Sequence, residues 1–124
     1  MIDFDPSALR ILIVEDEALV ALMIEDMVGD MGFSVAGVAS TLDEAMSKVG
    51  SIDFDFAILD MNLFGRESRP VAEALVDKAI PFIFATGYAK AGVPGYVPGI
   101  PVLGKPFRQA DLQATISAVL NEAA

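Results

Sequence analysis

Four short apolar runs in this chain each lead into a polar residue that can take part in chemistry. The runs span residues 11–14, 56–59, 81–85 and 102–103, and the polar residues that follow them are Glu15 and Asp16, Asp60, Thr86 and, after Gly104, Lys105. Short apolar runs of this kind are typical of buried parallel strands. Because ligands bind outside the carboxyl ends of parallel strands, we expect carboxylates, a hydroxyl and an amine to meet in one cleft.

Segments with the apolar spacing of helices alternate with these runs. We predict strands at residues 10–14, 33–39, 54–59, 82–85 and 101–103, a polar loop at 62–69, and helices at 17–31, around 42–49, at 70–79 and at 107–123. Ser40 or Thr41 can cap the second helix, with Glu44 three residues after Thr41 as a capping box, and Pro70 suits the first turn of the third helix. The side chains expected to pack inward include Met23, Met27, Met31, Met46, Val71, Ala74, Leu75 and Val76. Strands that alternate with helices indicate an α/β fold with a mostly parallel sheet.

Residues 87–100 interrupt this alternation, because they contain four glycines and two prolines. This content of helix breakers predicts that the fourth crossover is mostly loop, with at most a turn of helix near Lys90. Two interpretations stay open. The segment is either a plain surface connection or a functional loop that starts beside Thr86.

The composition limits the classes of partner. A chain of 124 residues with 54% hydrophobic residues is long enough for a core, and we place a single domain at residues 1–124. The net charge of −10 argues against nucleic acid and anionic membranes, since both attract clustered lysine and arginine. The chain has no cysteine and no histidine, which excludes thiolate or imidazole metal sites and a phosphohistidine on this chain. Without a signal peptide or a spanning segment, a cytoplasmic protein is expected.

Four short motifs carry a resemblance to a known family. They are Val14-Glu15-Asp16, Leu59-Asp60-Met61-Asn62, Ala85-Thr86-Gly87 and Gly104-Lys105-Pro106-Phe107. In order and approximate spacing they resemble the CheY-like receiver domains of response regulators, and the resemblance covers residues 10–120. It implies a flavodoxin-like sheet of five parallel strands in the order 2-1-3-4-5. It also implies two-component signalling, in which a sensor histidine kinase or a histidine phosphotransferase phosphorylates one aspartate.

The chemistry of the residues fits the roles that this resemblance implies. Asp60 is the expected phosphoacceptor, whose carboxylate forms an acyl phosphate. Glu15, Asp16 and Asp60 offer oxygen ligands for Mg²⁺ or Mn²⁺, and the backbone carbonyl of Asn62 matches the remaining protein ligand of the family. Lys105 places a compact positive charge on a phosphoryl oxygen. Phosphoryl transfer depends mainly on such positioning and electrostatics, so no general base is required.

The chain also departs from the common receiver pattern. Val102 stands three positions before the lysine, where the family usually has an aromatic switch residue. Residues 84–88, Phe-Ala-Thr-Gly-Tyr, instead resemble the FAT GUY subgroup, whose fourth helix is short or disordered. Thr86 is expected to offer its hydroxyl to a phosphoryl oxygen. Thr86, Gly87 and Tyr88 form the expected switch, through which phosphorylation would order residues 87–99.

The resemblance carries further expectations about partners and geometry. Leu19, Val20 and Phe107 are candidate kinase contacts. A chain of this length leaves no room for an output domain, so we expect a stand-alone receiver that acts on an unknown downstream protein. Many receivers dimerise through the fourth helix, fifth strand and fifth helix, and without a proper fourth helix we expect a monomer. The Lys105–Pro106 peptide bond is expected to be cis, as it is in the family.

Other functions remain as alternatives. A pseudo-receiver would keep the fold as a protein-interaction module without the chemistry, and a phosphate sink or relay would lack a dedicated output. We expect a phosphoacceptor that removes its own phosphoryl group slowly, rather than a conventional enzyme. A phosphatase of the haloacid dehalogenase type needs a second aspartate two residues after the nucleophile, where this chain has Asn62. A flavodoxin-like electron carrier is disfavoured, since Trp and hydroxyl-rich phosphate-binding stretches are absent.

Overall fold

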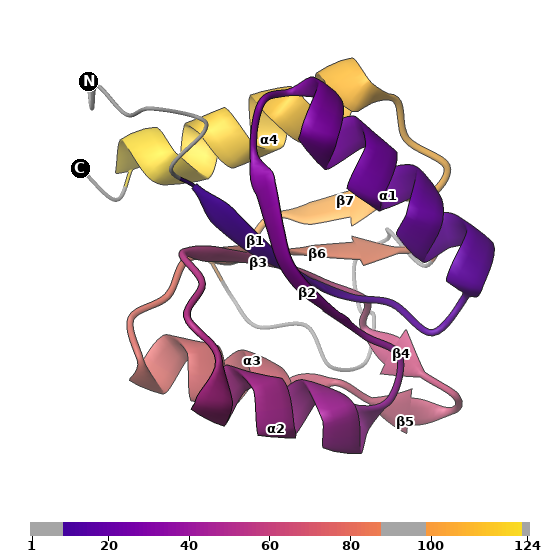
Figure 1. Ribbon diagram of the computed structural model, residues 1–124, viewed down its shortest axis with the longest axis vertical. Coiled ribbons are helices and arrows are strands. Elements are labelled where there is room, and N and C mark those ends of the chain that lie inside the picture. Colours follow the sequence, from indigo (N-terminus) through magenta and orange to yellow (C-terminus); the bar gives the residue numbers. More distant parts are fainter. Residues whose placement is uncertain (1–8, 88–98, 123–124) are drawn as a thin grey trace.

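The computed structural model describes residues 9–87 and 99–122, as an α/β unit of helices on both faces of one sheet (Figure 1). Its elements are β1 (Arg10–Val14), α1 (Ala18–Asp30), β2 (Ser34–Ala39), α2 (Leu42–Ser51), β3 (Phe56–Leu59), β4 (Asn62–Leu63), β5 (Arg66–Glu67), α3 (Arg69–Asp77), β6 (Phe82–Thr86), β7 (Val102–Gly104) and α4 (Gln109–Glu122). The predicted strands and helices are therefore confirmed to within a few residues at their ends. The predicted short or missing fourth helix, a turn near Lys90, and Tyr88 lie outside the described residues.

The main sheet has five parallel strands in the order β2-β1-β3-β6-β7. When the two short strands β4 and β5 are set aside, this is the expected flavodoxin-like order 2-1-3-4-5. All five strands run in one direction, so their carboxyl ends share one edge of the sheet. That edge receives the polar residues that follow the apolar runs.

Each face of the sheet packs against two helices. On one face, α1 and α4 cover a core that includes Ile13, Ile58 and Ile116. On the other face, α2 and α3 cover a core that includes Leu12, Leu59 and Leu75. Successive strand residues point to opposite faces, so both faces of β1 and β3 are apolar. This burial on both faces explains why the strands read as continuous apolar runs rather than as alternating ones.

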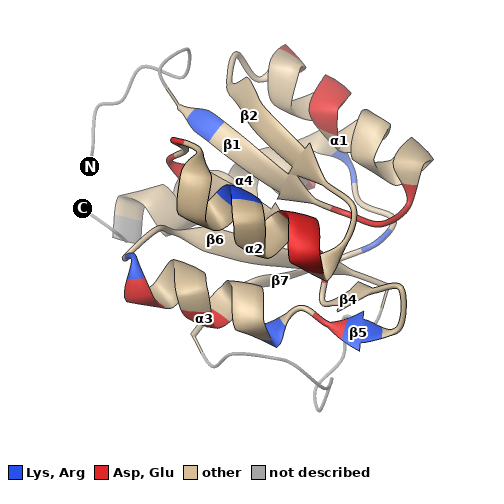
Figure 2. Cartoon of the chain, turned by 60° about the horizontal axis from the view of Figure 1, so that its bottom comes forward, with Lys and Arg blue, Asp and Glu red and all other residues tan. Residues whose placement is uncertain are grey.

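Local sequence signals set the starts of two helices. The Thr41 hydroxyl accepts a hydrogen bond of 3.1 Å from the Glu44 backbone N–H, which confirms the predicted cap of α2. Helix α3 carries Pro70 in its first turn, where the missing N–H costs nothing. Figure 2 shows more acidic than basic residues along these two helices, and Asp43, Glu44, Glu73 and Asp77 all lie at the exposed surface.

The prediction of a polar loop at residues 62–69 missed two short strands. Strands β4 and β5 pair antiparallel as a small hairpin, with Asn62 opposite Glu67 and Leu63 opposite Arg66. Strands of two residues show no measurable periodicity, which is why sequence patterning missed them. The hairpin lies at the carboxyl edge of the main sheet, beside the start of α1.

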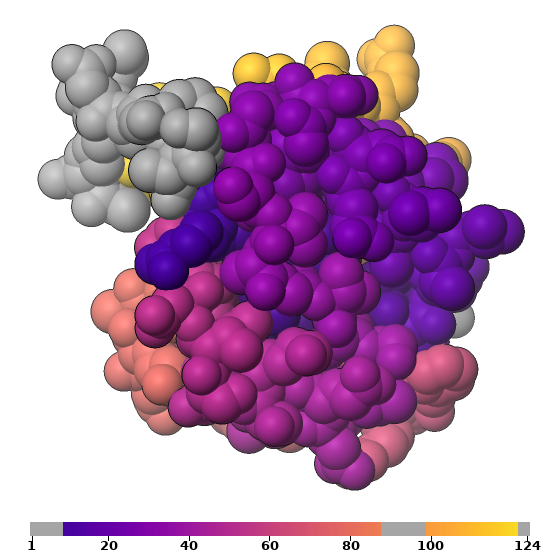
Figure 3. Space-filling view, in the orientation of Figure 1, coloured from indigo at the N-terminus to yellow at the C-terminus, as the bar shows by residue number. Residues whose placement is uncertain are grey.

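The prediction that helically spaced apolar residues pack inward was also partly wrong. Helix α1 is apolar almost all round, and it buries Ala21, Ile24 and Val28 instead of Leu22 and Met23. The large apolar side chains left exposed are Leu19, Leu22, Met23, Met46, Phe64 and Val76. Figure 3 shows α1, β2 and α2 together forming most of one surface of the molecule. Three of these exposed apolar side chains, Leu19, Leu22 and Met23, lie in the first half of α1.

An ion pair at the amino-terminal edge of the sheet gives a pH-dependent contribution to stability. Arg10 Nε lies 3.1 Å from Asp55 Oδ2, and this hydrogen bond lowers the pKa of Asp55. A carboxylate with a lowered folded-state pKa stabilises the fold above its unfolded pKa of about 3.9, and loses that contribution as the pH falls further. We expect Asp55→Asn to lower the melting temperature slightly at pH 7 and to have little effect near pH 2. An equal loss at both values would contradict a charged pair.

Ser68 is buried at the junction between β5 and α3, with only 1% of its surface exposed. Its hydroxyl has no hydrogen-bond partner among the residues that the structure describes. An unsatisfied buried hydroxyl costs about 1–3 kcal/mol. We therefore expect Ser68→Ala to raise the free energy of unfolding by about 1 kcal/mol in urea denaturation, since the substitution removes one polar atom and leaves little cavity. Unchanged or lower stability would show that the hydroxyl is satisfied.

Candidate functional site

The carboxyl ends of four strands bring the predicted polar residues together. Glu15 follows β1, Asp60 follows β3, and Lys105 follows β7, whereas Thr86 is the last residue of β6. Glu15 and Thr86 are each 1% exposed, and Asp60 is 8% exposed. Buried polar groups at a strand edge are costly unless they are paired. Their placement agrees with the cleft that the four apolar runs predicted.

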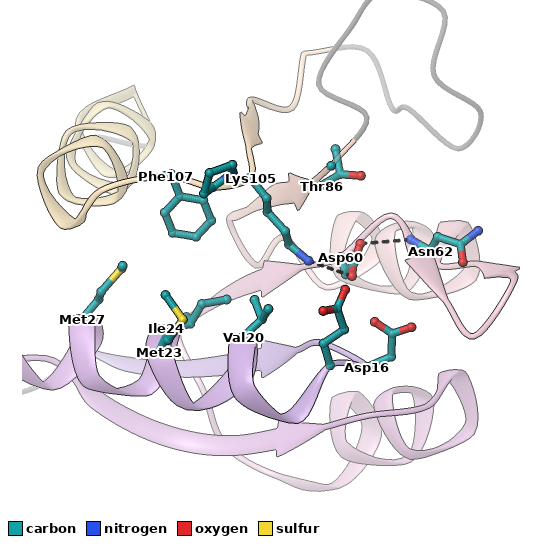
Figure 4. A pocket seen from close by; sticks show the side chains of 13 residues that line it. Asp16, Val20, Met23, Ile24, Met27, Asp60, Asn62, Thr86, Lys105 and Phe107 are labelled. Atoms are coloured by element: carbon teal, nitrogen blue, oxygen red, sulfur yellow. Dashed lines mark hydrogen bonds and ion pairs between the residues drawn. The ribbon is translucent and has the colours of Figure 1, made fainter.

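Lys105 joins two of the acids. Its Nζ donates to Asp60 Oδ2 at 3.0 Å and forms a hydrogen-bonded ion pair with Glu15 Oε1. Figure 4 shows the lysine side chain reaching from the segment after β7 to the Asp60 carboxylate. One cation thus balances part of the charge of two buried carboxylates.

Burial and the neighbouring charges shift the pKa values of this group. Burial raises the pKa of Glu15, and the nearby Asp60 raises it further, although the hydrogen bond from Lys105 opposes both effects. Burial lowers the pKa of Lys105, but its bonds to Glu15 and the charge of Asp60 outweigh burial, so the net pKa lies above its ordinary value. The lysine is therefore held as a cation.

Asp16 lies on the hairpin side of this group. Its Oδ2 accepts a hydrogen bond of 2.9 Å from the Phe64 backbone N–H. Burial raises the pKa of Asp16, but the Phe64 N–H and the Glu15 side chain together lower it below its ordinary value. Asn62 contributes through its backbone, whose N–H donates to Asp60 Oδ1 at 3.3 Å, and its side-chain Oδ1 accepts from Gly65 N–H at 2.9 Å.

The three carboxylates have the chemistry and spacing of a site for a hard divalent cation. Glu15, Asp16 and Asp60 each offer an oxygen, and these atoms lie within 4.8 Å of one another. Carboxylate oxygens are the ligands that Mg²⁺ prefers in proteins. Three acids with one nearby lysine also leave net negative charge to be neutralised. The donor set therefore fits the cation that the family resemblance implies.

A cavity of about 710 Å³ opens beside these residues. Asp16, Asp60, Thr86 and Lys105 lie at one end of it, and its opposite side is apolar. The apolar lining comes from α1 and from the segment before α4, and consists of Val20, Met23, Ile24, Met27, Pro106 and Phe107. The polar cluster thus continues directly into an apolar groove. Gly87 also lines the cavity, and the Lys105–Pro106 peptide bond beside it is cis.

The sequence model of the response regulator receiver domain matches residues 11–117, which is most of the chain. This chain belongs to the response regulator receiver domain family. The match spans the strands and helices that form the cleft, so the receiver domain and the described site coincide.

The chain is also similar to individual receiver proteins, both in sequence and in structure. It is 36% identical over 117 residues to the phyllosphere-induced regulator PhyR of Methylorubrum extorquens, covering 91% of this chain and 44% of that protein. It is 29% identical to the chemotaxis protein CheY of Pseudomonas aeruginosa, covering 91% of this chain and 97% of that protein. The solution structure of SdrG from Sphingomonas melonis superposes with a TM-score of 0.81 at 41% identity, covering 92% of this chain and 98% of that one.

The similarity to PhyR and SdrG is consistent with the FAT GUY subgroup that residues 84–88 resemble. The chain spans about half the length of most of the curated relatives that it matches first. Within the part of the receiver domain that the structure describes, none of the helices is long and apolar enough to cross a membrane.

Two features of the receiver site were missed by sequence reasoning. The Phe64 backbone N–H was not foreseen as a partner of Asp16, although the Phe-Gly pair at residues 64–65 was an available turn signal. The apolar side of the cavity was foreseen only at Val20 and Phe107, since the methionines of α1 were assigned to the core. Among the α1 methionines that were assigned to the core, Met23 has 55% of its surface exposed.

Proposed function

We propose that Asp60 is the phosphoacceptor of a two-component signalling pathway, and that its phosphorylation by a histidine kinase or a histidine phosphotransferase changes protein–protein binding. The observation that carries the proposal is the position of Asp60. Its carboxylate is held at 3.0 Å from the Lys105 ammonium, within a cluster of three acids, and at the polar end of an open cavity. A carboxylate placed only to form a turn would need none of these neighbours.

The transfer is a nucleophilic substitution at phosphorus. An oxygen of the Asp60 carboxylate forms the new bond to phosphorus, and the bond from phosphorus to the donor imidazole nitrogen breaks. The electron pair of that bond stays on the nitrogen. A bound Mg²⁺ or Mn²⁺ would neutralise charge on the phosphoryl oxygens, and Glu15, Asp16, Asp60 and the Asn62 carbonyl would hold it.

The protein residues then supply position and charge. Lys105 moves from its contact with Asp60 to a phosphoryl oxygen as the acyl phosphate forms, because the bond to phosphorus removes the negative charge of the Asp60 carboxylate and the phosphoryl oxygens carry negative charge instead. Thr86 lines the same cavity, and its hydroxyl is the candidate donor to a second phosphoryl oxygen. Glu15 keeps a hydrogen bond of 3.1 Å from the Glu17 N–H, which holds its carboxylate in place.

The apolar side of the cavity supports a protein phosphodonor. Val20 and Phe107 line it, and Leu19, on the same helix as Val20, is 77% exposed. A donor imidazole must reach Asp60 through this opening, so apolar contacts around it would hold the donor protein.

Transfer from a protein donor tests this function. A histidine phosphotransferase domain labelled on its histidine is mixed with the wild-type chain and with Asp60→Asn, in the presence of Mg²⁺. Loss of label from the donor and its appearance on the wild-type chain alone is the expected result. Binding of the donor without any transfer would instead favour the pseudo-receiver, which is a pure interaction module.

A further inference from the structure

The β4–β5 hairpin has a turn of defined handedness beside the acid cluster. The turn residues, Phe64 and Gly65, have φ values of +52° and +80°, so the two-residue loop is a type I′ turn. Asn-Gly is the usual sequence for this turn, because both residues must adopt positive φ. A phenylalanine in this region is strained, and this one is also 67% exposed. Burial of the phenyl ring therefore does not account for this strained backbone conformation.

The backbone of this turn is tied to the acid cluster. The Phe64 N–H donates to Asp16 Oδ2, and the Gly65 N–H donates to Asn62 Oδ1, both at 2.9 Å. The second bond closes the turn on itself, and the first joins the turn to the segment between β1 and α1 across 48 residues of sequence. The direction of the Phe64 N–H depends on the φ values of the turn, so the contact depends on its geometry.

The other two acids are oriented differently. Lys105 contacts both Glu15 and Asp60, and backbone N–H groups next to each acid also bind them. Asp16 has no direct hydrogen bond with Lys105 within the described part of the chain. Its carboxylate is instead bound by the hairpin. Groups that hydrogen-bond to metal ligands commonly orient them, and their loss typically weakens metal affinity 10–100-fold.

We propose that the β4–β5 turn is the positioning element of Asp16, and that the Phe64 backbone N–H holds this carboxylate in the orientation that shares a divalent cation with Glu15 and Asp60. The proposal rests on the cation site of the proposed function. It assigns to the Phe-Gly turn a role in cation affinity that neither residue could perform with its side chain.

Two glycine substitutions at matched backbone positions test the proposal. Gly65 and Gly99 both have positive φ, at +80° and +88°, and a Cβ at either would meet nothing within 4 Å. Gly65→Val and Gly99→Val therefore impose a similar backbone penalty, but only the first alters the turn at Asp16. Mg²⁺ affinity is measured by isothermal titration calorimetry, after circular dichroism has established that each variant is folded.

We expect Gly65→Val to bind Mg²⁺ roughly tenfold more weakly than wild type, and Gly99→Val to bind it with wild-type affinity. Equal affinities in the two variants would overturn the proposal. If the wild-type chain binds no Mg²⁺ at all, the proposal and the cation site of the proposed function both fall. Loss of affinity in Gly65→Val alone supports the positioning role, whether or not Asp60 later proves to be the phosphoacceptor.

Two further measurements do not require a disrupted turn. Phe64→Asn relieves the strain and keeps both the turn and the N–H, so we expect wild-type Mg²⁺ affinity. A loss as large as that of Gly65→Val would assign the effect to the ring and overturn the proposal. In the wild-type chain, we expect the Phe64 amide to stay protected from hydrogen exchange when Mg²⁺ is added. Loss of protection on adding Mg²⁺ would show that Asp16 leaves the turn to bind the cation.

Discussion

Replacing Lys105 by methionine is expected to lower the free energy of unfolding of the cation-free protein by about 3 kcal/mol, because it leaves buried charge unpaired. Glu15 is 1% exposed and Asp60 is 8% exposed, so neither carboxylate can regain full hydration when the ammonium is removed. The raised pKa of Glu15 limits the loss, since burial already favours its protonated form. The measurement is urea denaturation in the presence of a chelator.

Lys78→Met provides the matched control. Lys78 is exposed at the end of α3, and its replacement should change the free energy of unfolding by no more than about 0.5 kcal/mol. Added Mg²⁺ should stabilise Lys105→Met more than it stabilises wild type, since a cation replaces part of the missing charge. Equal losses in the two lysine variants would contradict the ion pairs of Lys105 with Glu15 and Asp60.

The second large effect is expected from the cation itself. A ligand that binds only the folded state at 100 times its dissociation constant stabilises that state by about 2.7 kcal/mol. Saturating Mg²⁺ should therefore raise the melting temperature of the wild-type chain by several degrees, relative to sodium chloride at equal ionic strength. The physical cause is the repulsion among Glu15, Asp16 and Asp60, which a divalent cation removes.

Asp60→Ala separates this effect from general salt stabilisation. Removing one of the three acids should raise the melting temperature of the cation-free protein, and Mg²⁺ should then add less than it adds to wild type. Glu73→Ala, at an exposed position on α3, should change neither quantity. A melting temperature that responds neither to Mg²⁺ nor to Asp60→Ala would mean that the three acids do not share a cation.

Sequence patterning predicted the sheet and its polar edge well, for a physical reason. Strands β1, β3 and β6 are buried on both faces, so each reads as an uninterrupted apolar run that stops where the chain meets the cleft. The residue after such a run, Glu15 or Asp60, is then placed by the end of the strand itself. A separate local signal, the capping box of Thr41 and Glu44, predicted the capped start of α2.

The features that patterning missed depend on contacts between distant segments. Helix α1 carries apolar residues almost all round, so its spacing indicated a helix without indicating that Met23 would face outward and Ile24 inward. The β4–β5 hairpin consists of strands too short to show alternation. Its bond from Phe64 to Asp16 joins residues that only the fold brings together.

Phosphoacceptance by Asp60 is tested most directly by the intact mass of the chain after incubation with acetyl phosphate and Mg²⁺. Wild type and Asp60→Asn are compared, each with and without the cation. We expect one added phosphoryl group, in the wild-type chain alone and only when Mg²⁺ is present. An unmodified wild-type chain, or the same adduct on Asp60→Asn, would contradict the assignment of Asp60 as the phosphoacceptor.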